Sequence, residues 1–158
     1  MSRALSFALV SLALAACTPG QSAQKDDAAA AVEVSGALCR PTPVGRQTTG
    51  CYLSLTAPAD DRLVGVSSPV AGRAQLHGSR VESNMMMMYE IRDGLPLPAG
   101  QVVELKPGGS HVMLLAVTEP LKAGDSVPLT LTFASAAPVE ITAPVGQPAL
   151  TDAGEAAH

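Results

Sequence analysis

The sequence has no tryptophan, and its 158 residues include only two tyrosines and two phenylalanines. The chain therefore has few aromatic side chains on which bases or sugars could stack. Charged residues make up only 15% of the chain, and 10 Lys and Arg against 14 Asp and Glu give a formal net charge of −4. Because the basic residues form no cluster, the chain lacks the positive field that nucleic acid requires, and we expect no nucleic-acid partner.

Long helices are also disfavoured, because 14 Gly and 13 Pro are spread through the chain. The hydrophobic fraction of 47% is nevertheless high enough for a packed core, and the length suits one domain. From residue 32 onward, short apolar runs are separated by turns rich in Pro and Gly, and Leu129, Leu131 and Phe133 alternate with polar residues as in a half-buried strand. This pattern predicts an all-β fold, an antiparallel Greek-key β-sandwich. Its expected strands are 32–39, 50–56, 63–67, 73–79, 85–91, 102–105, 111–118, 127–133 and 139–143.

The first 16 residues have the pattern of a secretory signal peptide, with Arg3 before an apolar run that is too short to span a bilayer. The run ends in Leu-Ala-Ala followed by Cys17, which is typical of a bacterial lipobox, so we expect Cys17 to be lipidated. An ordinary signal peptide with an incidental Cys17 is the alternative. Thr18 stands where Asp would usually mark retention at the inner membrane. We therefore expect a periplasmic protein held to the membrane only by its lipid, with the outer membrane favoured.

This organisation divides the chain into four parts. The signal peptide is 1–16, and a flexible tether without apolar periodicity follows at 17–31. The β-sandwich domain is 32–145, and 146–158 is a flexible tail.

Cysteine usage agrees with an exported protein. Lipidation of Cys17 leaves Cys39 and Cys51, and such a pair in an oxidising compartment favours a disulfide. The segment between them is rich in Pro and Gly and can fold back on itself. A metal-binding role for the pair is the alternative.

Methionine and histidine are concentrated in one part of the chain. Met85, Met86, Met87, Met88 and Met113 are all the methionines apart from Met1, and His77 and His111 lie beside or among them. Thioether sulfur is a soft, neutral donor, and together with imidazole it selects Cu(I) over harder ions. The segment has neither the carboxylate cluster that favours Ca²⁺ or Mg²⁺ nor the thiolate that favours Zn²⁺.

Spacing selects the candidate ligands. His111 and Met113 are two residues apart, so on a strand their side chains share one face. Ten residues separate His77 from Met88, 22 separate Met88 from His111, and one separates His111 from Met113. Met86 has the same strand parity as Met88 and is a further candidate. The candidate Cu(I) ligands are therefore His77, Met88, His111 and Met113, with Met86 as a possible additional ligand, and the residues by themselves leave open which methionine of the run 85–88 binds.

The ordered set His77, Met88, His111 and Met113 closely resembles the copper-binding signature of the PCuAC family of periplasmic copper chaperones. The likeness extends to segments 61–69, 98–100, 105–109 and 121–129 and covers about residues 32–145. It implies a cupredoxin-like fold, no enzymatic activity, and delivery of Cu(I) to apo-proteins, typically the copper centres of cytochrome c oxidase. The four-Met run and the cysteine pair depart from that family's usual pattern.

Other functions stay open. The same site would suit copper sequestration or resistance, and a structural lipoprotein could use the Met run for packing while its sandwich binds protein partners. A blue-copper carrier is disfavoured because no cysteine lies near the motif. No Ser–His–Asp arrangement indicates an acyl-transfer enzyme. His158 is interpreted as a bystander, and Asp60-Asp61 as a polar turn.

Overall fold

The computed structural model describes residues 31–148 as ten β-strands. Within that range no helix is long and apolar enough to cross a membrane. The predicted signal peptide, the lipidated Cys17 and His158 lie outside the described residues. The strands are β1 (Glu33–Cys39), β2 (Thr48–Thr56), β3 (Asp61–Ser67), β4 (Ala71–Glu82), β5 (Met85–Glu90), β6 (Leu95–Leu97), β7 (Val102–Leu105), β8 (His111–Val117), β9 (Ser126–Phe133) and β10 (Val139–Pro144).

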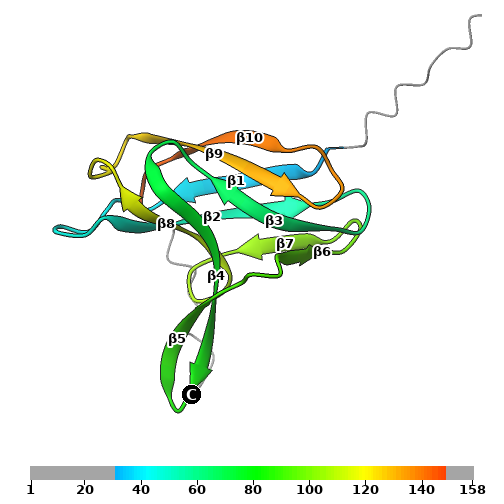
Figure 1. The fold of residues 1–158 in the computed structure, drawn as a ribbon, viewed down its shortest axis with the longest axis horizontal. Helices are drawn as coiled ribbons and strands as arrows, with labels where there is room; N and C mark the ends of the chain where they lie inside the picture. The colour runs from blue at the N-terminus through cyan, green and yellow to red at the C-terminus, as the bar shows by residue number, and fades with distance from the viewer. Residues whose placement is uncertain (1–30, 149–158) are drawn as a thin grey trace, which may run out of the picture.

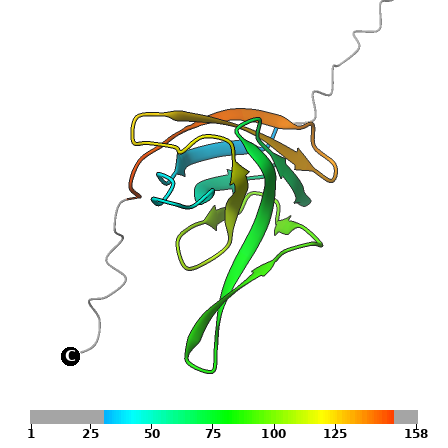
Figure 2. The same cartoon turned by 60° about the vertical axis from the view of Figure 1, so that its left-hand side comes forward.

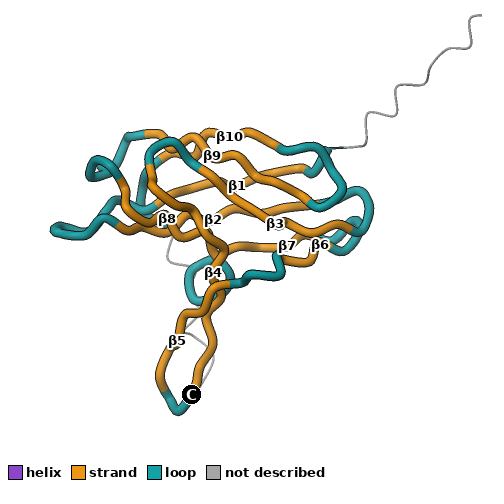
Figure 3. Tube along the Cα trace, viewed as in Figure 1, coloured by secondary structure: helices purple, strands orange, loops and turns teal. Residues whose placement is uncertain are grey.

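The strands form two antiparallel sheets packed face to face (Figure 1, Figure 3). The first sheet has the order β1-β2-β8-β4-β5, and β7 also pairs with β2. The second sheet has the order β10-β9-β3-β6. The predicted all-β sandwich is confirmed.

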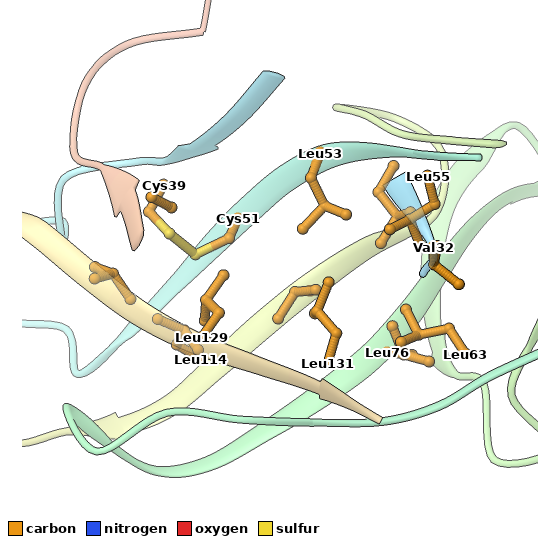
Figure 4. Close-up of a cluster of buried hydrophobic side chains, with 14 of the residues drawn as sticks. Val32, Cys39, Cys51, Leu53, Leu55, Leu63, Leu76, Leu114, Leu129 and Leu131 are labelled. Carbon is orange, nitrogen blue, oxygen red and sulfur yellow. A yellow bond between two sulfur atoms is a disulfide. The ribbon is translucent and has the colours of Figure 1, made fainter. Parts of the chain in front are cut away.

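The core lies between the sheets and is built mainly from leucine (Figure 4). Leu53, Leu55 and Leu114 project from the first sheet, and Leu129 and Leu131 from the second, with at most 2% of each side chain exposed. Burying a leucine completely stabilises the fold by roughly 1.5–3 kcal/mol. Buried residues alternate with more accessible ones along β2 and β9. One face of each sheet therefore packs in the core, and the other face is available for binding.

The predicted disulfide joins Cys39 on β1 to Cys51 on β2 inside the core (Figure 4). The two residues are opposite each other in the ladder, and the neighbouring bond from Arg40 N–H to Gly50 O identifies them as a non-hydrogen-bonded pair. Such pairs bring strands closest together, which explains a Cα–Cα distance of 4.0 Å, shorter than the usual span of about 4.4–6.8 Å. The alternative of a cysteine metal site is therefore wrong.

The nine expected strands are all present, but the structure differs from the prediction in two places. The short strand β6 was not expected, because its three residues include Pro96 and show no alternation. Strand β4 continues to Glu82, well beyond the predicted end at Ser79, so that β4 and β5 form a hairpin that projects from the body of the sandwich (Figure 1, Figure 2). Ser83 and Asn84 form its two-residue turn with φ of 50° and 62°, as type I′ hairpins require.

Asp61, which was expected to be part of a polar turn, connects β3 to the segment after β9 through hydrogen bonds. Its carboxylate accepts hydrogen bonds from the backbone N–H of Ser135 at 3.0 Å and Ala136 at 2.8 Å. Burial alone would raise the pKa of Asp61, but the backbone N–H groups of Ala136, Arg62 and Ser135 outweigh that effect and lower it. The ionised carboxylate is therefore the form that stabilises this connection.

Candidate metal site

Strands β4 and β8 bring His77 and His111 together on the outer face of the first sheet. The two residues are directly paired in the ladder, and Met113 is paired with Gln75. Opposed residues in an antiparallel pair point to the same face. Because Leu76 and its neighbours in the ladder point into the core, His77, His111 and Met113 point away from it. The ring centroids of the two histidines are 6.0 Å apart.

The β4–β5 hairpin adds two methionines to the same face. Met88 pairs with Ser79 and Met86 with Val81, and both partners have the parity of His77 on β4. The side chains of Met85 and Met87 therefore point to the opposite face of the hairpin. Met86 and Met88 are each 58% exposed, so their thioethers are accessible to an ion arriving from solvent.

A groove of about 790 Å³ runs along this face. Four of the five predicted ligands line it: Met86, Met88, His111 and Met113. His77 does not line the groove and instead lies beside His111. The rest of the lining comes from Tyr52 and Ser79, from segments 40–44 and 48–50, from Pro107 and Gly108, and from Gln147.

Hydrogen bonds leave one nitrogen of each histidine ring free for a metal. His111 is only 6% exposed, and its Nδ1–H donates to the carbonyl oxygen of Gly109 at 3.1 Å, so Nε2 keeps its lone pair. The Nε2 of His77 lies 3.4 Å from Oε1 of Gln75, to which it donates. The Nδ1 of His77 is buried and has no hydrogen-bond partner among the described residues. A buried nitrogen with a free lone pair fits a metal ion, since such a group is otherwise costly to leave unsatisfied.

Gln75 is itself held in place. Its Nε2 donates to Oε1 of Glu90 at 2.7 Å, and the other carboxylate oxygen of Glu90 lies 3.0 Å from Nε of Arg92. The carboxylate of Glu90 therefore orients the side-chain amide of Gln75 so that the amide oxygen faces His77. A metal-binding histidine is commonly oriented by such a chain, which determines the tautomer and the direction of the lone pair.

Electrostatics also favour the metal-binding form of His77. Burial lowers its pKa, the neighbouring His111 lowers it further, and Glu90 opposes both effects. The lowered pKa keeps the ring neutral at pH 7, and a neutral imidazole is the form that coordinates a metal.

The donors gathered here are imidazole nitrogen and thioether sulfur, all neutral. Within residues 31–148, no three His, Cys, Asp or Glu side chains are grouped so that they could hold an ion. The carboxylate of Glu90, which lies beside the site, is already bound to Gln75 and Arg92. This donor set is the kind that prefers Cu(I) to harder ions.

Comparison with known proteins agrees with this fold and site. The family described as "Putative lipoprotein LpqE-like" matches residues 32–145. The chain belongs to this family. A relative named "Putative lipoprotein Lxx21020", from Leifsonia xyli subsp. xyli (strain CTCB07), is 30% identical over 146 residues, covering 90% of this chain and 88% of the relative.

Solved structures similar to this LpqE-like domain include PCuAC domains, which confirms the resemblance to that family and the cupredoxin-like fold. The copper-bound PCuAC domain from PmoF2 is 28% identical with a TM-score of 0.60, covering 74% of this chain and 93% of that domain. The solution structure of CuI-DR1885 from Deinococcus radiodurans is also 28% identical, with a TM-score of 0.59, covering 78% and 85%.

Sequence reasoning missed Gln75 and Glu90. Gln75 precedes His77 by two residues, so its shared face could have been recognised from strand parity. Glu90 joins the site only through the register of β4 against β5, which places it opposite His77.

Proposed function

We propose that this LpqE-like lipoprotein binds one Cu(I) ion through His77, Met88, His111 and Met113, with Met86 as an additional ligand. The observation that carries this proposal is the shared outer face on which β4, β5 and β8 place two imidazoles and the methionine thioethers. The copper-bound state of similar PCuAC domains supports it.

The ion is cargo in this proposal. Neutral donors leave Cu(I) with its positive charge, and Met86 and Met88 hold it at an exposed hairpin. A thiolate acceptor offers a negatively charged, softer ligand and can therefore remove the ion. We infer that the protein is a non-enzymatic chaperone that hands Cu(I) to apo-proteins, and the copper centres of cytochrome c oxidase are the acceptors that we expect.

The location of the protein is part of the same proposal. A lipid on Cys17 would hold the domain at the periplasmic side of a membrane, with the outer membrane favoured. The relative from Leifsonia xyli that is named a lipoprotein supports the anchor.

Two matched double variants test the site. Replacing Met86 and Met88 by Leu removes thioethers from the groove, whereas replacing Met85 and Met87 by Leu changes the same strand on its other face. Titration with Cu(I) against a chromophoric chelator under reducing conditions should show one ion per wild-type chain. The first variant should lose affinity by about tenfold or more, and the second should keep it. Equal affinities would contradict the proposed ligands, and absence of stoichiometric copper in the wild type would favour a structural lipoprotein.

Delivery is tested separately from binding. Copper-loaded protein is mixed with an apo copper-binding domain of cytochrome c oxidase, and the metal content of each is measured after separation. Transfer to the oxidase domain is expected. Retention of the copper in the presence of that acceptor would favour sequestration.

A further inference from the structure

Strand β5 is the edge of the first sheet and the outer strand of the projecting hairpin (Figure 1). Its residues from Met85 to Tyr89 are all between 42% and 62% exposed. Natural edge strands are usually guarded by charge, proline or a bulge against pairing with another chain. Residues 83–89 contain neither charge nor proline, and the ladder to β4 is regular. Among residues 31–148 no strand pairs with this edge, which leaves it open to an added strand from a partner.

The register shows which backbone groups point outward. The bond from Ile91 N–H to Leu76 O makes those two residues a hydrogen-bonded pair. Pairs alternate along an antiparallel ladder, so Met85, Met87 and Tyr89 also direct their N–H and C=O groups toward β4. The backbone groups of Met86, Met88 and Glu90 consequently point away from the sheet, toward the free edge.

The same alternation connects this edge to the metal site. Met86 and Met88 have both outward backbone groups and side chains that line the groove. A strand added beside β5 would place every second side chain on the groove face, with its Cβ about 4.5–5.5 Å from that of the opposed methionine. At that separation two sulfur atoms can reach one metal ion.

We propose that the free edge of β5 is the docking site of the copper acceptor, which adds an extended segment carrying a cysteine opposite Met86 or Met88. This inference rests on the proposed function. Main-chain hydrogen bonds would supply affinity without demanding one particular sequence, as in other cases of strand addition. The alternating side chains would align the cysteine with the ion.

Transfer on this edge is a ligand exchange without redox chemistry. The acceptor thiol loses its proton to solvent, and its thiolate forms a bond to Cu(I). The bond from Cu(I) to the thioether of Met86 or Met88 breaks first, and the remaining bonds to the imidazoles and thioethers of this protein then break as further donor groups of the acceptor or water replace them. The copper stays Cu(I), and the methionine returns to its free state.

A pair of short peptides tests the docking mode. One is an alternating threonine–valine peptide with a single central cysteine. The other has the same side chains but an N-methyl group on every internal amide, which blocks strand pairing along both backbone edges. The first peptide should slow the hydrogen exchange of the amides of Met86, Met88 and Glu90 and take Cu(I) from the loaded protein. The N-methylated peptide should leave those amides unchanged and take copper about tenfold or more slowly.

A protein variant with a matched control supports the same test. M85K/M87K adds charge to the edge strand on the face away from the groove, whereas V64K/V102K adds the same charge at exposed positions on other strands. Transfer to the unmodified peptide should slow only in M85K/M87K, while the Cu(I) affinity of both stays within about twofold of wild type.

Three outcomes would overturn the inference. The two peptides could take copper equally fast, or M85K/M87K could transfer at the wild-type rate. Alternatively, sedimentation could show that the protein alone forms a dimer, and hydrogen exchange could show that this dimer protects the same amides. A second copy would then be the occupant of this edge. Failure of the proposed function is distinguishable, because it appears as lack of Cu(I) binding, whereas amide protection by the peptide is measured without copper.

Discussion

Replacing Gln75 by Leu tests whether the hydrogen-bonded chain from Glu90 through Gln75 to His77 prepares the metal site. The change removes the amide oxygen 3.4 Å from Nε2 of His77 and the amide donor 2.7 Å from Glu90. The two side chains have similar volumes, so the shape of the outer face is kept. His77 then loses the acceptor that keeps its proton on Nε2 and leaves Nδ1 with a free lone pair.

The position of Gln75 determines how much the Cu(I) affinity and the free energy of unfolding should change. Loss of a partner that orients a metal-binding histidine typically lowers metal affinity by about 10–100-fold, or about 1.4–2.7 kcal/mol. Gln75 lies on the solvent side of the sheet, away from the core, so the free energy of unfolding should change by only about 0.5 kcal/mol. Gln101→Leu replaces an exposed glutamine in a turn outside the site and serves as the control.

The assay combines chelator competition for Cu(I) with ¹⁵N NMR of the imidazole nitrogens. In the metal-free wild type, we expect His77 to carry its proton on Nε2 and His111 to carry its proton on Nδ1. Gln75→Leu should weaken Cu(I) binding and change only the signals of His77. Wild-type affinity in Gln75→Leu, or a proton on Nδ1 of His77 in the wild type, would refute the reasoning.

Further predictions concern the fold and the anchor. Replacing Cys39 and Cys51 together by Ala opens the loop that the disulfide closes and should lower the free energy of unfolding by about 3 kcal/mol in denaturant titrations, whereas an unchanged midpoint would contradict this. Asp61→Asn should cost about 1 kcal/mol at neutral pH. Because the folded pKa of Asp61 is lowered, its contribution is present above the unfolded pKa near 3.8 and is lost as the pH falls through the folded pKa. Wild type and variant should therefore converge in acid, and a constant difference across pH would refute this. Cys17→Ser should release the protein from membrane fractions, and continued fractionation with membranes would argue against lipidation.

Alternation with a period of two, visible in the sequence, was enough to predict the sandwich and the shared face of His111 and Met113. Such alternation decides which side chains are buried, because slipping a strand by one residue would expose its leucines. The parity of Met86 and Met88 against Met85 and Met87 followed from the same rule. The order and spacing of the histidines and methionines were specific enough to indicate a PCuAC-like domain.

Only the tertiary structure decided how these faces meet. Strand parity cannot say that His77 is opposite His111, because that depends on the register between β4 and β8, which is determined by the packing of Leu76 and Val112 in the core. It also cannot place Glu90 beside Gln75, since these residues lie on different strands. The extension of β4 to Glu82 is a third example, because it depends on pairing with β5 rather than on a buried face of its own. That pairing places the methionines of β5 in contact with solvent and leaves one edge of β5 without a neighbouring strand among the described residues.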